Sequence, residues 1–124
     1  WDSPVLVELA GPQALNNTFF TNFYSTEDKN PISNNFVESY KKEYGAIPDS
    51  MAAMGYDAAN LLVDAIRRAN STESAKIREA LSATKNFKSV SGEMSLNETH
   101  DAVRGVVIIE MKNGKQVYKE TIKP

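Results

Sequence analysis

The chain has 124 residues, which is enough for one domain and too short for two ordinary ones. Of these residues 41% are hydrophobic and 24% charged, a composition typical of a folded domain. Its net charge of −2 provides no broad basic face, so nucleic acid is not an expected partner. It contains no cysteine, which excludes disulfides, thiolate metal sites and a cysteine nucleophile.

The first part of the chain predicts a helix, a strand and a second helix. Ser3 can cap a helix with Pro4 at its first position, and the helix ends at residues 11–12, a Gly-Pro pair. Residues 18–24 are aromatic and β-prone, which favours a mostly buried strand. The Asn-Pro pair at 30–31 then opens another helix by the same logic, and Gly45 stops it.

The third predicted helix is the longest and runs from about Met51 to Ala69. Gly55 inside it costs about 1 kcal/mol relative to alanine, so we expect a packing reason for it. Tyr56 and Asp57 have two interpretations of equal weight. They face a cleft, or Tyr56 packs while Asp57 complements the positive helix N-terminus.

After a fourth helix that follows residues 71–72, the sequence pattern changes to strands. Residues 87–96 predict a short extended stretch broken at Gly92, and residues 103–111 a single strand buried on both faces in its middle. Asn-Gly at 113–114 is a strong hairpin signal, so residues 116–122 should pair back on that strand. One strand followed by three helices makes a poor sheet alone, which suggests a piece of a larger α/β fold.

Little in the sequence indicates catalysis or metal binding. His100 is the only histidine, in a polar turn where a solvated side chain is the simpler interpretation. A small hydrolase or transferase using His100 remains an alternative, as does a structural α+β interaction module. The acidic residues near His100 lack the spacing of a calcium loop, and we expect no metal and no cofactor.

Several segments resemble the leucine/isoleucine/valine-binding family of bacterial amino-acid-binding proteins that serve ABC importers. The resemblance rests on WDSPVLVELAG, NTFFTNFYS, FVESYKKEYGAIPDSMAAMGYDAANLLVDAI, IREALSAT, FKSVSGEMSLN and VVIIEMKNGKQV, which occur in the expected order over nearly the whole chain. The family has a type I periplasmic-binding-protein fold with two Rossmann-like α/β lobes and a ligand cleft between them. The resemblance implies that this chain is a C-terminal segment of such a carrier.

The resemblance also implies how the segment divides between the lobes. About residues 25–90 form the helical part of one lobe, and about residues 1–24 and 91–124 belong to the other. Residues 18–24 and those near 90–92 match two crossings between the lobes. The implied function is to bind branched-chain or related amino acids for import, without catalysis, together with the membrane subunits of the importer. The implied location is periplasmic or extracellular, with a lipid anchor in a Gram-positive organism. The alternative with the same fold is a sensor domain or an amide-responsive regulator.

Few residues of the family's binding site have counterparts in this chain. Met51 matches a position that borders the ligand side chain, and Trp1, Asp2 and Tyr56 are further candidates for the wall of the site. The family's carboxylate-binding hydroxyls and its ammonium-binding acidic residue lie outside this segment, so we expect the isolated chain to bind amino acids weakly or not at all. We also expect it to cover its exposed core surface by self-association or strand exchange.

Overall fold

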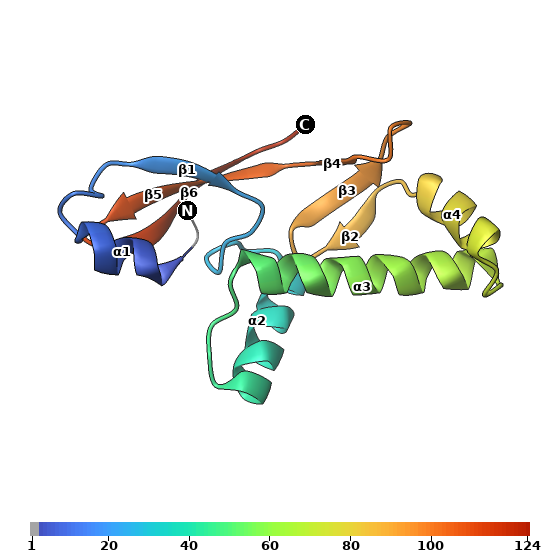
Figure 1. Ribbon diagram of the computed structural model, residues 1–124, viewed down its shortest axis with the longest axis horizontal. Coiled ribbons are helices and arrows are strands. Elements are labelled where there is room, and N and C mark those ends of the chain that lie inside the picture. The colour runs from blue at the N-terminus through green and yellow to red at the C-terminus, as the bar shows by residue number, and fades with distance from the viewer. Residues whose placement is uncertain (1–2) are drawn as a thin grey trace.

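The structure, a computed structural model, describes residues 3–124 and contains helices and short antiparallel strands (Figure 1). In chain order the elements are α1 (Pro4–Ala10), β1 (Phe19–Asn22), α2 (Pro31–Tyr44), α3 (Ser50–Ala69), α4 (Ser74–Ser82), β2 (Phe87–Ser89), β3 (Gly92–Leu96), β4 (Ala102–Arg104), β5 (Val106–Lys112) and β6 (Lys115–Ile122).

The helices begin where the capping signals indicate. The Ser3 hydroxyl accepts a hydrogen bond from the Val5 amide at 3.3 Å, and the Asn30 side chain accepts one from Ile32 at 3.0 Å. Asp49 caps α3 through the Ala52 amide at 2.8 Å. Each side-chain oxygen satisfies a backbone N–H that the first helical turn leaves without a partner. The predicted starts of α1 and α2 are confirmed, and α3 starts one residue before the predicted Met51.

The strands form two separate sheets. The first sheet has the order β1-β5-β6 and the second sheet the order β2-β3-β4, and every neighbouring pair is antiparallel. In the first sheet Phe19 lies opposite Glu110, and the Asn113–Gly114 turn joins β5 to β6 as predicted. A register shift between Ile108 and Ile109 marks a β-bulge in the β5–β6 pair.

The single strand predicted over residues 103–111 is wrong, because Gly105 divides it into β4 and β5, which belong to different sheets. The chain therefore passes between the sheets twice, first after β1 through residues 23–30 and again at Gly105. We name these two segments the first crossing and the second crossing. The crossing expected near residues 90–92 is instead the turn of a hairpin within the second sheet, where Ser89 pairs with Gly92.

Two further expectations from the sequence differ from the structure. The first strand is not mostly buried, because Phe19 leaves 55% of its surface exposed on the outer face of β1. Gly55 has no packing reason among the described residues, since a Cβ built there would meet nothing within 4 Å. The glycine in α3 is therefore a local cost to helix stability that no close contact explains.

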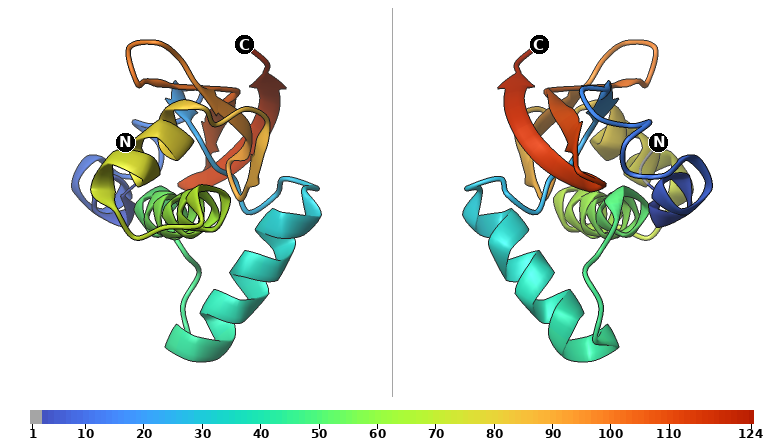
Figure 2. Two further views of the ribbon diagram at one scale, coloured as in Figure 1. Left: turned by 90° about the vertical axis from the view of Figure 1, so that its right-hand side faces the viewer. Right: turned by 90° about the vertical axis from the view of Figure 1, so that its left-hand side faces the viewer.

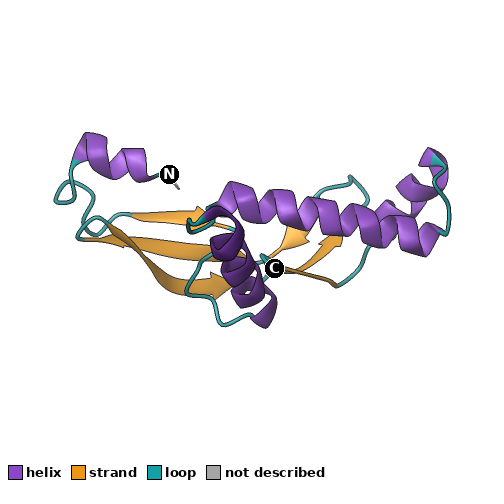
Figure 3. Cartoon of the chain, turned by 90° about the horizontal axis from the view of Figure 1, so that it is seen from below, coloured by secondary structure: helices purple, strands orange, loops and turns teal. Residues whose placement is uncertain are grey.

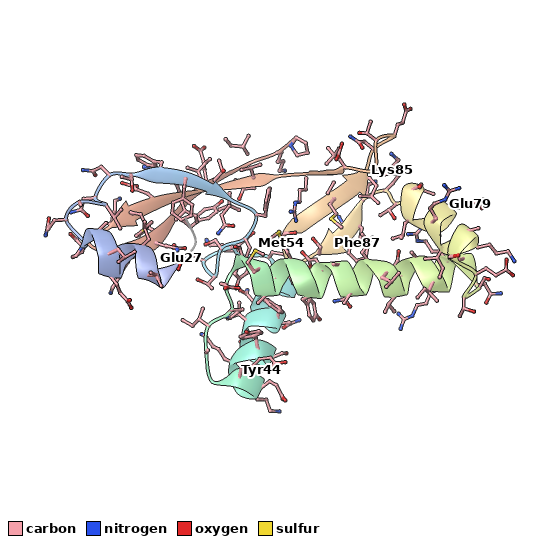
Figure 4. All side chains as sticks on the ribbon, in the orientation of Figure 1. Glu27, Tyr44, Met54, Glu79, Lys85 and Phe87 are labelled. Carbon is pink, nitrogen blue, oxygen red and sulfur yellow. The ribbon has the colours of Figure 1, made fainter. Side chains whose placement is uncertain are left out.

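The two sheets lie at different positions along an elongated molecule. In Figure 1, α1 lies beside the first sheet, whereas α3 runs along the second sheet toward α4. The end-on views of Figure 2 show α2 leaving the other elements at a steep angle. In Figure 3, which is seen from below, α2 lies in front of the other elements, and α1 and α4 lie toward opposite ends of the molecule. Tyr44, at the end of α2, is accordingly far from both sheets (Figure 4) and largely exposed.

The hydrophobic core lies where α2, α3 and the β2–β3 turn meet. Its buried members are Tyr24, Phe36, Val37, Ala53 and Val90. The first sheet buries a separate row of β5 side chains, which are Val107, Ile109 and Met111.

Glu110 is a buried acidic residue on the same strand β5. Its carboxylate lies 3.2 Å from the Lys112 ammonium and 3.4 Å from that of Lys119 on β6. Charge pairing of this kind offsets part of the cost of removing a carboxylate from water.

Candidate functional site

The residues expected to border a ligand do not lie on one face of α3. Met51 is at the start of the helix with 68% of its surface exposed, whereas Tyr56 is 47% exposed and packs its ring 4.9 Å from that of Phe36. Five residues along an α-helix turn through about 140°, so the two side chains diverge. Trp1 and Asp2 lie outside the described residues. The ligand-contact role of all four residues stays a prediction.

A small polar pocket lies close to Met51 in the chain, between the first crossing and the loop that leads into α3. Its volume is about 180 Å³. The described residues that line it include amide, hydroxyl and carboxylate groups: Asn22, Tyr24, Ser25, Thr26, Ile47, Pro48, Asp49, Ile109 and Gln116. Small-molecule sites usually measure about 300–1,000 Å³, so this pocket is at most part of a complete site.

Several polar groups of this pocket already have hydrogen-bond partners within the fold. The Asn22 side chain accepts from the Phe23 amide at 2.9 Å, and the Ser25 hydroxyl accepts from the Glu27 amide at 3.2 Å. Both bonds are local, between residues one or two positions apart in the chain. These two side chains of the pocket wall therefore already accept a hydrogen bond from the backbone.

Asp57 has a role that the sequence did not indicate. Only 3% of its surface is exposed, and its carboxylate accepts hydrogen bonds from the Val90 amide at 2.7 Å, the Ser91 amide at 3.1 Å and the Ser91 hydroxyl at 2.7 Å. A buried carboxylate is retained when donors of this kind replace water. Asp57 thus ties the middle of α3 to the turn between β2 and β3.

Arg104 extends this buried cluster toward the crossings. One guanidinium nitrogen donates to the Ser91 hydroxyl at 3.1 Å, another lies 3.6 Å from the Met54 sulfur, and the group sits 3.9 Å from the centre of the Phe23 ring. Burial lowers the pKa of Arg104, and the nearby charge of Asp57 opposes that effect. Figure 4 shows Met54 near the start of α3, between the parts of the molecule that carry the two sheets.

The only sequence signal for this cluster was an arginine followed by a glycine beside an apolar strand. Nothing in the spacing of Asp57, Ser91 and Arg104 indicates that they meet, because the partners are 13 to 34 residues apart in the chain.

His100 lies in the turn between β3 and β4, at a left-handed backbone position. Its Nδ1 is 3.5 Å from the Ser82 hydroxyl oxygen. A nucleophile and its base usually lie about 2.6–3.2 Å apart, so this pair does not have the geometry of an activated serine. Within residues 3–124, no group of three or more histidine, cysteine or acidic side chains is placed to hold a metal ion.

The mixed helices and sheets described above match the periplasmic binding protein fold. The family described as "Periplasmic binding protein" matches residues 2–116, and the chain belongs to it.

Solved structures of longer proteins support the same family. The chain is 40% identical to a leucine-binding protein, LivK, from Thermotoga maritima, with a TM-score of 0.87, over 99% of this chain and 35% of that protein. It is 28% identical to the branched-chain amino acid transporter substrate-binding protein LivJ from Streptococcus pneumoniae in complex with isoleucine, with a TM-score of 0.85, over 98% of this chain and 35% of that one.

A third solved structure shows that the similarity extends beyond amino-acid complexes. A solute-binding protein of an ABC transporter from R. palustris, in complex with benzoate, is 27% identical over 95% of this chain and 33% of that protein, with a TM-score of 0.78. The chain thus spans about a third of the length of these relatives. No helix among the described residues is long and apolar enough to cross a membrane.

Proposed function

We propose that this chain is part of the solute-binding component of an ABC importer for branched-chain or related amino acids. The observation that carries the proposal is the 40% identity to a leucine-binding protein across 99% of the chain. The complex of a second relative with isoleucine supports the same class of ligand. The proposed partners are the amino acid and the membrane subunits of the importer, and the proposed location is the periplasm or the cell exterior.

In this proposal the two sheets belong to two lobes that close on the ligand. The first sheet with α1 goes to one lobe, and the second sheet with α2, α3 and α4 goes to the other. Since β3 pairs with β2 and β4 pairs with β3, we assign residues 92–104 to the second group rather than to the first. Motion of this kind occurs at a few residues between rigid elements, and the two crossings are the segments available for it here.

The proposed ligand position is the face near the start of α3, where Met51 is exposed and lies two residues after Asp49, which lines the 180 Å³ pocket. An amino-acid zwitterion needs paired charges and hydrogen-bond donors at both of its ends when it is buried. Because the relatives are about three times as long, we assign most of these groups to the part of the protein that lies outside this chain.

The test is thermal unfolding of the full-length protein with leucine, isoleucine, valine and benzoate. A ligand that binds only the folded state stabilises it by about 2.7 kcal/mol at a hundredfold excess over Kd. A shift with a branched-chain amino acid supports the proposal. Benzoate is included because one relative binds it, and a shift with benzoate alone would replace the amino-acid assignment with an aromatic acid.

The role of Met51 is tested by calorimetric titration of the same protein with the ligand that shifts its unfolding. Met51→Ala should weaken binding, since it removes apolar surface from the wall of the site. Val63→Ala is the matched control, because Val63 is also an exposed apolar residue of α3 and lies about 120° around the helix from Met51. Equal effects of the two substitutions would contradict the placement of the ligand.

A further inference from the structure

Arg104 is next in the chain to one of the two segments that pass between the sheets, and its side chain contacts the other. Arg104 is the last residue of β4 and directly precedes Gly105, the second crossing. Its guanidinium lies 3.9 Å from the ring centre of Phe23, which opens the first crossing after β1. The two crossings are distant in the chain, and this cation–π contact joins them directly.

The guanidinium is also held from the side of the second sheet. It donates to the Ser91 hydroxyl at 3.1 Å, and Ser91 is in turn fixed by the Asp57 carboxylate at 2.7 Å. Asp57 lies on α3, so the arginine is connected to the helix that runs along the second sheet. Arg104 is therefore held in place by residues of the second sheet and α3. Its guanidinium lies over the ring of Phe23, which follows the first strand of the first sheet.

The second crossing is closely packed as well. A Cβ at Gly105 would lie 3.1 Å from the Ile122 carbonyl oxygen and 3.4 Å from a Thr121 methyl carbon, both at the end of β6. The backbone here passes against the first sheet with little spare space. A change in the angle between the sheets must accordingly alter the geometry of Gly105 or the contact of Arg104 with Phe23.

We propose that Arg104 is a positioning residue that holds the two crossings together and so restricts the angle between the two sheets. The inference rests on the proposed function only in treating the sheets as parts of two lobes. Lysine should not replace Arg104 fully, because an ammonium lacks the planar group that lies over the ring and donates to several partners at once.

The experiment uses the full-length protein without ligand. It measures the distance between a spin label on the first sheet and a spin label on α4, which the proposed function assigns to the same lobe as the second sheet. Lys115→Cys on β6 and Glu79→Cys on α4 place the labels at exposed positions, and this chain has no cysteine of its own. Pulsed electron–electron double resonance then gives the distribution of distances between the two labels. We expect a broader distribution for Arg104→Ala than for the parent, and an intermediate width for Arg104→Lys.

Arg68→Ala is the matched control. Arg68 makes contacts as extensive as those of Arg104, with the Asp64 carboxylate at 2.7 Å, the Ala80 carbonyl at 2.5 Å and the Thr84 hydroxyl at 2.9 Å. All of these partners lie on α3, on α4 or just after α4, so none belongs to the first sheet or to a crossing. Its loss should leave the width of the distance distribution unchanged.

Phe23→Leu provides a second test that leaves the buried polar cluster intact. It removes the ring beneath the guanidinium and should also broaden the distribution, even where Arg104→Ala prevents folding. Unchanged widths for the folded Arg104 and Phe23 variants would overturn the proposal, as would equal broadening by Arg68→Ala. Failure to bind any amino acid would contradict the proposed function and leave this result unaffected, since the measurement uses no ligand.

Discussion

Replacing Asp57 by alanine should be among the most destabilising single changes in the described part of the chain. The carboxylate accepts three hydrogen bonds, two of them from the backbone amides of Val90 and Ser91. The Ser91 hydroxyl keeps a neighbour in the Ser89 hydroxyl at 3.1 Å, but the two amides lose their acceptor in a buried position. Each unsatisfied buried donor costs about 1–3 kcal/mol. With the loss of the charge beside Arg104, we expect a total of about 3–5 kcal/mol, the usual cost of breaking a buried pair.

The assay is urea unfolding followed by circular dichroism, with the midpoint and the slope compared between variants. Asp64→Ala is the matched control, because Asp64 lies two turns further along α3 and forms a part-exposed ion pair with Arg68 at 2.7 Å. Such pairs contribute about 0–1 kcal/mol. The reasoning would be refuted if Asp57→Ala cost no more than Asp64→Ala.

The remaining predictions concern pH, two glycines and association. Burial would raise the pKa of Glu110, but the hydrogen bonds and charges of its two lysine partners outweigh burial and lower the pKa below the ordinary value of a glutamate. The stability contributed by this group is therefore complete above the unfolded-state pKa and is lost as pH falls through the folded-state pKa, so Glu110→Gln should flatten the acid side of the stability curve. Gly55→Ala should raise the free energy of unfolding by about 0.5–1 kcal/mol, since a Cβ there has no atom within 4 Å. Gly105→Ala should lower it, because a Cβ there lies 3.1 Å from the Ile122 carbonyl oxygen. Equal shifts of the thermal midpoint for the two variants would contradict both expectations. The isolated chain should self-associate through its exposed apolar residues, and light scattering should show a mean molar mass above that of a monomer. Leu62→Lys on α3 should reduce this mean molar mass. A parent chain that is monomeric would refute the expectation.

Local signals in the sequence were enough to locate most elements. Asn30 followed by a proline marks the start of α2 because both residues act within one turn of the helix, as the 3.0 Å bond to the Ile32 amide shows. The Asn113–Gly114 pair likewise specifies its hairpin through backbone angles that each residue adopts by itself, with φ of 50° and 75°. Features of this kind depend on neighbours in the chain and can be predicted from one sequence.

The parts that sequence analysis missed depend on partners far along the chain. The β-prone residues on both sides of Arg104 and Gly105 were interpreted as one strand. Only the pairing of β4 with β3, and of β5 with β1 and β6, shows that Gly105 separates two sheets. Asp57 has a carboxylate typical of a helix surface, and its burial follows from Val90 and Ser91, more than thirty residues away. The candidate ligand wall is incomplete for the same reason, since relatives about three times as long contain groups that this chain does not.

The pairing of β1 with β5 has a consequence for the order of folding. β1 precedes the second sheet in the chain, yet its partner residues 107–110 are synthesised only after the whole segment that forms the second sheet. The second sheet, by contrast, pairs strands that are close neighbours in the chain, and closing short loops costs less entropy than closing long ones. We therefore expect the second sheet to form first as an inserted unit. Among the described strands β1 pairs with β5 alone, so a copy of this chain that is stopped before β5 would keep an unpaired aromatic strand open to other chains.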